Sequence, residues 1–543
     1  MRRSLLIREF DIAIVGSGFA GSLLAMIARK LGRSVVLLEK GRHPRFAIGE
    51  SSTPLANLLL EELAVRYDLP RLLPLCKWGS WQDTYPEIAC GLKRGFTFYH
   101  HRAGRRFTPD PMRERQLLVG ASPHAAIADT HWYRPDFDHF LLREAQALGA
   151  EYLDEIALAE FSPGPGGGVL TGTRQGRPVS IQAGFVVDAT GPRGFLHQAL
   201  GLPEVGFPHL PSTQGLYAHF TGVGCVGDLE GIPGEGSPPF PVDEAALHHV
   251  FDGGWIWVLR FNNGLTSAGV AARDPLAEEL GFSEGAPAWD RLLSRFPGVA
   301  AQFAGAVLQT GFVHAPRLSF RSGTVAGPGF ALMPSAAGFV DPLLSTGFPL
   351  ALLGIARLGA ALAEDWGSPR FAGRMEAYAA ETAAELAAAE RLVSALYANM
   401  ADFEVFAALT RLYFAAVSYT ETARRLGRPE RAGSFLLDRH PGFGGKARDC
   451  LERARVPMDF PAKARLLADI AMVIEPFDVA GLGDPARRNW HPVMEEDLYR
   501  AAPKLGATRE DIAGLLERCG FAAPALRVPA SHEPDISRVS PVQ

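Results

Sequence analysis

The sequence predicts an α/β protein with an inserted β-sheet domain and a helical C-terminal region. A glycine-rich turn joins a strand to a helix near the N-terminus, and strand and turn signals continue to about residue 365. Beyond residue 370 the composition becomes rich in Ala, Glu and Leu, which favours helix. We expect a nucleotide-binding domain over residues 1–200 and 305–365, a β-rich substrate domain over 201–304, a helical region over 366–530 and a tail over 531–543.

The overall composition narrows the classes of function. The chain has 543 residues, of which 47% are hydrophobic and 21% charged, and its formal net charge is −5. This balance is typical of a globular protein and gives no reason to expect binding to nucleic acid. The five cysteines form no CxxC pair, so we expect a reducing, cytoplasmic location and no metal site. No window of about 20 uninterrupted apolar residues is present, so we expect no stable membrane insertion.

The N-terminal segment predicts a strand–helix–strand unit. Residues 11–15 (DIAIV) and 34–38 (SVVLL) are apolar runs typical of buried strands, and residues 23–31 between them favour a helix. Further helices are expected at 55–68 and 137–148.

Downstream, loops alternate with regular elements. Irregular structure is expected over 70–125 and, because Pro and Gly are frequent there, over 201–241. Residues 254–261 and 265–272 flank an Asn-Asn-Gly turn and predict a β-hairpin. A helix is predicted from 348 to 364.

The turn after the first strand, residues 16–21 (GSGFAG), has the pattern of a Rossmann-type nucleotide-binding unit. Gly16 permits the tight turn, Gly18 lets a pyrophosphate approach the backbone, and Gly21 lets the helix pack on the strand. Glu39 ends the second strand 21 residues after Gly18, close to the spacing expected for the acid that binds a ribose hydroxyl. The combination predicts a dinucleotide site, for which NAD and FAD are both candidates.

Two later segments favour FAD over NAD. The sequence DATG closes a strong strand, which makes Asp188 and Gly191 candidate cofactor-binding residues. Asp341, a further candidate, begins the sequence DPLLSTG, which leads into a second helix start at Thr346 and Gly347. A chain that returns to its nucleotide site from so far along the sequence suits a long, extended cofactor, so FAD is the better choice.

The order of these motifs, with Gly49-Glu50-Ser51 between them, resembles the flavin monooxygenase superfamily and its para-hydroxybenzoate-hydroxylase-like fold. Within that superfamily, the GES segment and the late DPxxSTG motif resemble the flavin-dependent halogenases, over about residues 8–365. The resemblance implies that FAD is the cofactor. It also implies that residues 40–54 form a strap across one side of the flavin, with Gly49, Glu50 and Ser51 as cofactor-binding residues.

The strap segment has a simpler interpretation as well. Ser52 or Thr53 before Pro54 is by itself a good helix start. Both interpretations are compatible with Gly49, which allows unusual backbone torsions.

The resemblance further implies a reaction and its residues. FADH2 and O2 would convert halide into hypohalous acid, and a lysine would pass the oxidised halogen to an electron-rich aromatic acceptor. Thr346 and Gly347 would offer backbone N–H groups to the halide. The family lysine stands in a Lys-x-Gly-x-Thr-Phe context, which Lys93 matches in each defined position, although Lys77 lies closer to the strap in sequence.

A second family signature is present with departures. Trp255 and Trp257 match the family's Trp-x-Trp-x-Ile-Pro and fall on one face of a strand, which makes them candidate catalytic residues, although simple packing also explains them. Arg260 stands in place of the proline, and Ser335 where the family has aspartate. Leu344 stands where tryptophan halogenases have glutamate, which favours a phenol- or pyrrole-type acceptor.

A flavin-dependent monooxygenase, or a reductase or dehydrogenase of an apolar or aromatic substrate without halide, is the alternative. The sequence has no nicotinamide fingerprint, so a halogenase of this kind would need a separate flavin reductase that supplies FADH2. The sequence leaves open which acceptor is used, whether it is free or tethered to a carrier protein, and whether chloride or bromide is the halide.

Overall fold

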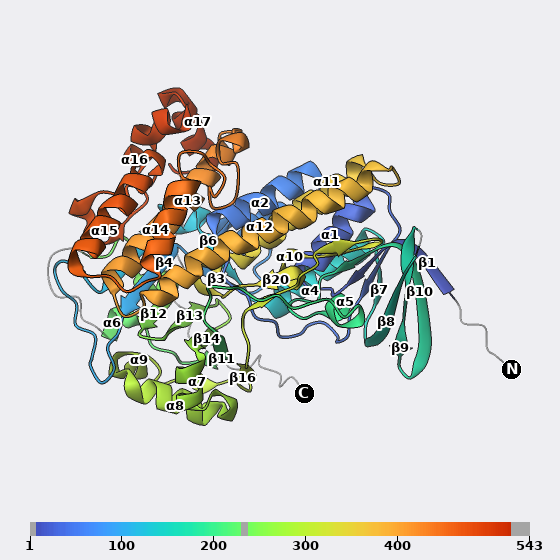
Figure 1. Ribbon diagram of the computed structural model, residues 1–543, viewed down its shortest axis with the longest axis horizontal. Helices are drawn as coiled ribbons and strands as arrows, with labels where there is room; N and C mark the ends of the chain where they lie inside the picture. The colour runs from blue at the N-terminus through green and yellow to red at the C-terminus, as the bar shows by residue number, and fades with distance from the viewer. Residues whose placement is uncertain (1–6, 165, 230–236, 523–543) are drawn as a thin grey trace.

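The computed structural model describes residues 7–164, 166–229 and 237–522 of the chain (Figure 1). The tail expected over 531–543 lies outside these residues. Two large sheets form the fold together with long helices, and the helices of the C-terminal region gather at one end of the molecule (Figure 1).

The first sheet is the expected nucleotide-binding sheet, with the strand order β18-β19-β10-β1-β2-β7 and with β8 and β9 attached through β10. β1 pairs in parallel with β10 and β2, and β10 pairs in parallel with β19, so the carboxyl ends of these strands meet at one edge. The strands are β1 (Ile7–Val15), β2 (Val35–Leu38), β7 (Glu151–Leu153), β8 (Ile156–Gly164), β9 (Gly167–Arg174), β10 (Arg177–Asp188), β18 (Ala326–Gly327) and β19 (Phe330–Leu332).

The predicted strand–helix–strand unit is confirmed. The helix α1 (Phe19–Lys30) joins β1 to β2, but it begins four residues earlier than the prediction of 23–31. The difference arises because the last part of the glycine-rich turn already forms the first turn of the helix, directly after Gly18.

The second sheet has nine strands in the order β15-β11-β14-β13-β12-β4-β5-β21, with β16 paired to β11. The predicted hairpin is confirmed as β13 and β14, which pair antiparallel. The strands are β4 (Gly95–His100), β5 (Gln116–Gly120), β11 (Thr213–Thr221), β12 (Ala246–Phe251), β13 (Gly254–Arg260), β14 (Thr266–Arg273), β15 (Val307–Leu308), β16 (Val313–Ala315) and β21 (Trp490–His491).

Two expectations of irregular structure are wrong. The segment 70–125 contains α3 (Trp78–Thr84), β3 (Cys90–Lys93), β4 and β5, and the segment 201–241 contains β11. Every residue of β4 is buried, so this strand lacks the alternation of apolar and polar residues that reveals a strand with one exposed face. Because β4, β5 and β21 lie outside 201–304, the second sheet draws on three parts of the chain, and the division into domains stays a prediction.

The helices cover the first sheet and build the C-terminal region. The predictions for 55–68, 137–148 and 348–364 are confirmed by α2, α4 and α11. α12 runs beside α11 and reaches from the first sheet to the C-terminal helices (Figure 1). The helices are α2 (Pro54–Arg66), α4 (Arg134–Ala147), α11 (Gly347–Glu364), α12 (Arg370–Ala398), α13 (Phe403–Arg425), α14 (Gly444–Ala454), α15 (Phe460–Ile474), α16 (Glu495–Ala501) and α17 (Arg509–Cys519).

One helical stretch in the described part of the chain, Leu343–Glu364, is long and apolar enough to span a membrane. However, 67% of its most apolar window is buried inside the protein. Packing of that kind is typical of a core helix that is hydrophobic on most sides.

Candidate functional site

The turn after β1 is held by two close backbone approaches. Gly16 has a φ of +97°, and a Cβ atom there would lie 2.7 Å from the Ala189 carbonyl oxygen. A Cβ atom at Gly21 would lie only 2.0 Å from the Gly16 carbonyl oxygen. The loop therefore lies against the end of β10, and α1 approaches closer than any side chain would allow.

Gly18, in contrast, has charged side chains of both signs at ordinary contact distance from its Cβ position. A Cβ atom there would lie 3.4 Å from Asp138 Oδ2, 3.5 Å from Arg134 Nη2 and 3.6 Å from Arg45 Nη2. The sequence analysis missed both arginines, because no local pattern marks them and only the fold brings them to the start of α1. Two guanidinium groups and a helix N-terminus fit the pyrophosphate of a dinucleotide.

Glu39 is an ionised carboxylate at the end of β2. Its Oε2 accepts hydrogen bonds from Ser17 N at 3.1 Å and Ser17 Oγ at 2.8 Å, and Arg45 Nη2 lies 3.1 Å away. Burial alone would raise the pKa of Glu39, but Arg45 and the N–H groups of Gly41 and Ser17 outweigh it and hold the pKa below its usual range. A carboxylate in this position fits the hydroxyl groups of a ribose.

Asp188 is the last residue of β10, and Gly191 lies three residues beyond it. Asp188 accepts hydrogen bonds from Thr190 N at 2.8 Å and Leu196 N at 2.6 Å, so its carboxyl group fixes the turn that starts α5 (Phe195–Ala199). Gly191 has a φ of +87° and open space where a Cβ would be. The cofactor contacts predicted for both residues stay predictions, and Asp188 has a clear structural role besides.

Hydrogen bonds at three positions hold the strap in place. Gly49 has a φ of +92°, and its carbonyl oxygen accepts a 2.8 Å hydrogen bond from Arg134 Nη1. Trp132 N donates a 2.6 Å hydrogen bond to the Glu50 carbonyl oxygen. Thr53 caps α2 by accepting from the backbone of the first turn, so the helix-start interpretation is confirmed.

Glu50 is buried in the strap beside a histidine from the second sheet. Its Oε1 lies 2.8 Å from His219 Nε2, and its Oε2 has no hydrogen-bond partner among the described residues. His219 was not predicted as a site residue, because it lies in a segment that was expected to be a loop. The pair places a polar group at the junction of the strap and the second sheet.

Lys93 lies at the end of β3, under the strap. Its side chain is 0% exposed, and Nζ donates a 2.8 Å hydrogen bond to Ser51 Oγ and a further bond to the Ser52 carbonyl oxygen. The same nitrogen lies 3.8 Å from the centroid of the Phe96 ring. Burial lowers the pKa of Lys93, while the neighbouring Asp129 carboxyl group acts in the opposite direction. The predicted lysine and the predicted strap are thus brought into direct contact.

Trp255 and Trp257 lie on one face of β13, with ring centroids 5.6 Å apart. Trp255 Nε1 donates a 3.3 Å hydrogen bond to Asp341 Oδ1, which also accepts from Leu343 N at 2.9 Å. Tyr397 of α12 donates to Asp341 Oδ2 at 2.9 Å. Burial raises the pKa of Asp341 to about 6. Asp341 therefore joins the second sheet, the start of α11 and α12, and its predicted contact with the cofactor stays a prediction.

We expect Tyr397→Phe to lower the free energy of unfolding by about 1–3 kcal/mol, because it leaves one buried oxygen of Asp341 without a donor. Urea unfolding followed by fluorescence measures the change. Tyr419→Phe is the matched control, since its hydroxyl bonds only to the partly buried Lys504 carbonyl oxygen. Equal losses in the two variants would contradict the special role of Asp341.

The segment before α11 turns through two left-handed residues. Leu344 has a φ of +65° and Ser345 a φ of +55°, and Tyr413 holds the segment by donating a 2.9 Å hydrogen bond to the Leu344 carbonyl oxygen. Thr346 is buried, whereas Gly347 is exposed and has open space at its Cβ position. The first N–H groups of a helix lack helical partners, so this turn can receive an anion.

Arg260, the departure from proline, is held by neighbouring residues. Its guanidinium group donates to the carbonyl oxygens of Val223, at 2.9 Å, and Gly224, and lies 3.4 Å from Asp243 Oδ1. The side chain thus joins the segment that follows β11 to the end of β13.

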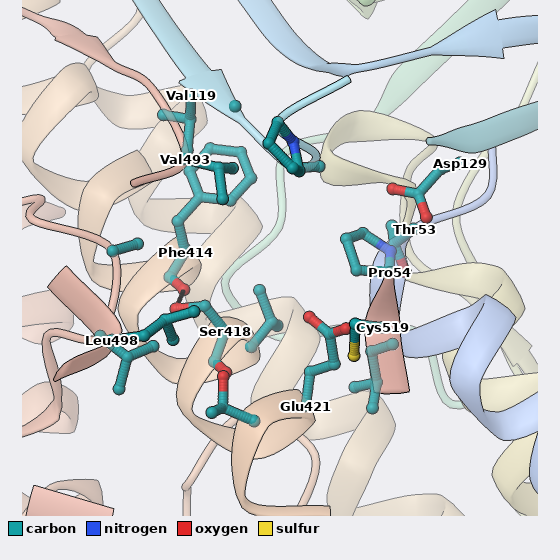
Figure 2. Close-up of a pocket in the computed structure, with 18 of the residues that line it drawn as sticks. Thr53, Pro54, Val119, Asp129, Phe414, Ser418, Glu421, Val493, Leu498 and Cys519 are labelled. Atoms are coloured by element: carbon teal, nitrogen blue, oxygen red, sulfur yellow. Dashed lines mark hydrogen bonds between the residues drawn. The ribbon is translucent and has the colours of Figure 1, made fainter. Parts of the chain in front are cut away.

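A cavity of about 150 Å³ lies between the start of α2 and the C-terminal helices (Figure 2). Phe96 is one of the residues that line it. Apolar side chains form most of its walls. Asp129 of β6 (Asp129–Trp132) lines it on one side, and Glu421 of α13 lines it on the other. Lys77 also lines the cavity, so the structure brings both candidate lysines near the same space, but only Lys93 contacts the strap.

Comparison with known proteins agrees with this arrangement. The family model described as FAD dependent oxidoreductase matches residues 11–302. The chain is 32% identical over 415 residues to monodechloroaminopyrrolnitrin halogenase PrnC of Pseudomonas fluorescens, which covers 75% of this chain and 70% of that protein. It is 31% identical over 355 residues to tetracycline 7-halogenase of Kitasatospora aureofaciens, which covers 63% of this chain and 61% of that protein.

Solved structures show a similar fold. Halogenase PltM in complex with phloroglucinol and FAD has a TM-score of 0.74 at 24% identity, with 89% of this chain and 99% of that chain covered. The flavin-dependent brominase Bmp2 has a TM-score of 0.58 at 21% identity, with 82% and 98% covered. At these identities the likeness concerns the fold alone, including both sheets and the helical region.

Proposed function

Because this chain belongs to the flavin-dependent halogenases, a family of FAD-dependent oxidoreductases, we propose that it halogenates an electron-rich aromatic acceptor with FADH2, O2 and halide. The observation that carries the proposal is the position of Lys93. Its buried amine touches the strap on one side and, through Phe96, the wall of the cavity on the other. A group in that position can pass a halogen from the flavin side to an acceptor.

The carboxyl edge of the first sheet would hold FAD. Gly18, Arg45 and Arg134 fit the pyrophosphate, and Glu39 fits the ribose, as their contacts indicate. When bound, FAD supplies the reaction with O2 that oxidises halide to hypohalous acid. Thr346 and Gly347 are proposed to hold the halide before that step.

Lys93 is proposed to receive the halogen from hypohalous acid. Because burial lowers its pKa, a larger fraction of the amine is neutral near pH 7 than for an exposed lysine, and only the neutral nitrogen has a free electron pair. A nitrogen–halogen bond forms as the oxygen–halogen bond breaks, and the hydroxide that leaves takes a proton from the amine. The Ser51 hydroxyl and the Ser52 carbonyl oxygen orient the nitrogen.

The acceptor is proposed to be of the phenol or pyrrole type, free or tethered to a carrier protein. The largely apolar cavity supports a ring-shaped acceptor. A relative that is 26% identical over 352 residues is named a chlorinase of 1H-pyrrole-2-carbonyl bound to a peptidyl-carrier protein. A separate flavin reductase is proposed to supply FADH2, and the cytoplasm is the proposed location.

The proposal is tested by incubating the purified chain with FAD, a flavin reductase, NADH, O2 and bromide over a panel of phenols, indoles and pyrroles. We expect a monobrominated product, which mass spectrometry recognises by its isotope doublet. Hydroxylated or reduced products without bromine, from every acceptor, would instead support the monooxygenase or reductase alternative.

A further inference from the structure

Asp129 is a buried carboxyl group with an unused oxygen. The residue is 6% exposed, and its Oδ1 accepts a 3.0 Å hydrogen bond from Asn57 Nδ2. Its Oδ2 has no hydrogen-bond partner within the described residues. A buried acceptor without a partner lowers the stability of the fold by about 1–3 kcal/mol, and by more when it is charged. A bound molecule that donates a hydrogen bond to this atom would remove that cost.

The carboxyl group that carries this oxygen forms part of the cavity wall. Asp129 is one of the residues that line it, and Figure 2 shows its carboxyl group directed inward, toward the space on whose other side Glu421 lies. Glu421 differs in one respect, because its Oε1 already accepts a 2.6 Å hydrogen bond from Arg425 Nε. Asp129 is therefore the carboxyl group of the cavity wall that retains an unsatisfied oxygen.

Lys93 stands opposite Asp129 in the ribbon of β3 and β6, as directly paired residues. The Lys93 amine donates hydrogen bonds to the strap, to Ser51 and Ser52, and Asp129 Oδ2 accepts none among the described residues. Burial raises the pKa of Asp129, and the charge of Lys93 acts against that rise. A molecule bound to Asp129 in the cavity would thus lie beside the residue proposed to deliver the halogen.

We propose that Asp129 is the residue that recognises the acceptor, with Oδ2 accepting a hydrogen bond from an N–H or O–H group on the aromatic ring. This inference rests on the proposed function and adds a chemical requirement to it. The acceptor carries a hydrogen-bond donor on or next to its ring. Electron density donated through this hydrogen bond also makes the ring more reactive toward an electrophilic halogen.

Binding of two molecules of similar shape tests the inference. Isothermal titration calorimetry, without halide or FADH2, compares 2-naphthol with 2-methylnaphthalene, which has no O–H group. We expect the wild-type chain to bind 2-naphthol at least about tenfold more tightly than 2-methylnaphthalene. About a tenfold difference in affinity is what one hydrogen bond to a charged group provides. Asp129→Asn should abolish the difference, because it keeps an oxygen for Asn57 and turns a donor toward the cavity.

Glu421→Gln is the matched control and should retain the preference, because glutamine keeps an oxygen for Arg425 and leaves Asp129 unchanged. Equal wild-type affinities for the two molecules would overturn the inference without any variant, even if Asp129→Asn failed to fold. Retention of the full preference in a folded Asp129→Asn would overturn it as well. The bromide assay separates this inference from the proposed function. If the wild-type chain brominates acceptors but binds 2-naphthol no more tightly than 2-methylnaphthalene, the proposed function stands and only the role of Asp129 in recognition is rejected.

Discussion

Lys93→Met is expected to reduce the yield of halogenated product by at least about 100-fold, the low end for loss of a group that acts directly on the reacting atoms. Methionine fills nearly the volume of lysine, so the fully buried site is not left as a cavity. FAD content and NADH-driven peroxide release should remain, because Gly18 and Glu39, which are proposed to hold the pyrophosphate and the ribose, make no hydrogen bond to Lys93. Product is measured by mass spectrometry, and peroxide by a coupled peroxidase assay.

Lys77→Met provides the control for Lys93. Lys77 lines the same cavity but is only half-buried, so its replacement should leave product formation mostly unchanged. The reverse pattern would transfer the halogen-carrying role to Lys77. Wild-type yields of halogenated product in both variants would show that neither lysine carries the halogen.

Gly18→Val is expected to abolish FAD binding without unfolding the protein. The φ and ψ angles of Gly18, −66° and −178°, are accessible to any residue. A Cβ atom would meet only ordinary contacts of 3.4 Å or more, yet it would stand where the pyrophosphate must approach. Absorbance of the purified variant near the flavin bands measures the bound cofactor.

Gly21→Ala is the variant to compare with Gly18→Val. Its Cβ atom would lie 2.0 Å from a backbone oxygen, so this variant should be destabilised, whether or not FAD is present. A folded Gly18→Val that keeps a full flavin spectrum would show that the pyrophosphate lies elsewhere.

The parts of the site that the sequence predicted depend on local chemistry. Gly16, Gly21 and Thr53 each act within a few residues of their own position, in a tight turn, a close helix packing and a helix cap. Lys93 was recognised by its immediate neighbours in the sequence, whereas its contact with Ser51 was not predicted.

The parts of the site that were not predicted depend on contacts between segments far apart in the sequence. Asp129 meets Lys93 only because β3 and β6 pair, and His219 reaches Glu50 from a strand that the Pro- and Gly-rich sequence concealed. Arg134 likewise reaches Gly18 from another helix. No spacing rule within a single sequence encodes such contacts.

The cavity wall is built from two parts of the chain, and the family model matches only one of them. Asp129 and Phe96 lie within residues 11–302, which match the FAD-dependent oxidoreductase family, whereas the wall formed by α13, α16 and α17 lies entirely beyond them. Substitutions in that far wall can reshape the space around an acceptor while the residues around the flavin and Lys93 stay unchanged. Evolution, or directed evolution in the laboratory, can therefore exchange one acceptor for another in this fold by varying the C-terminal helices alone, at little risk to the chemistry of the oxidant.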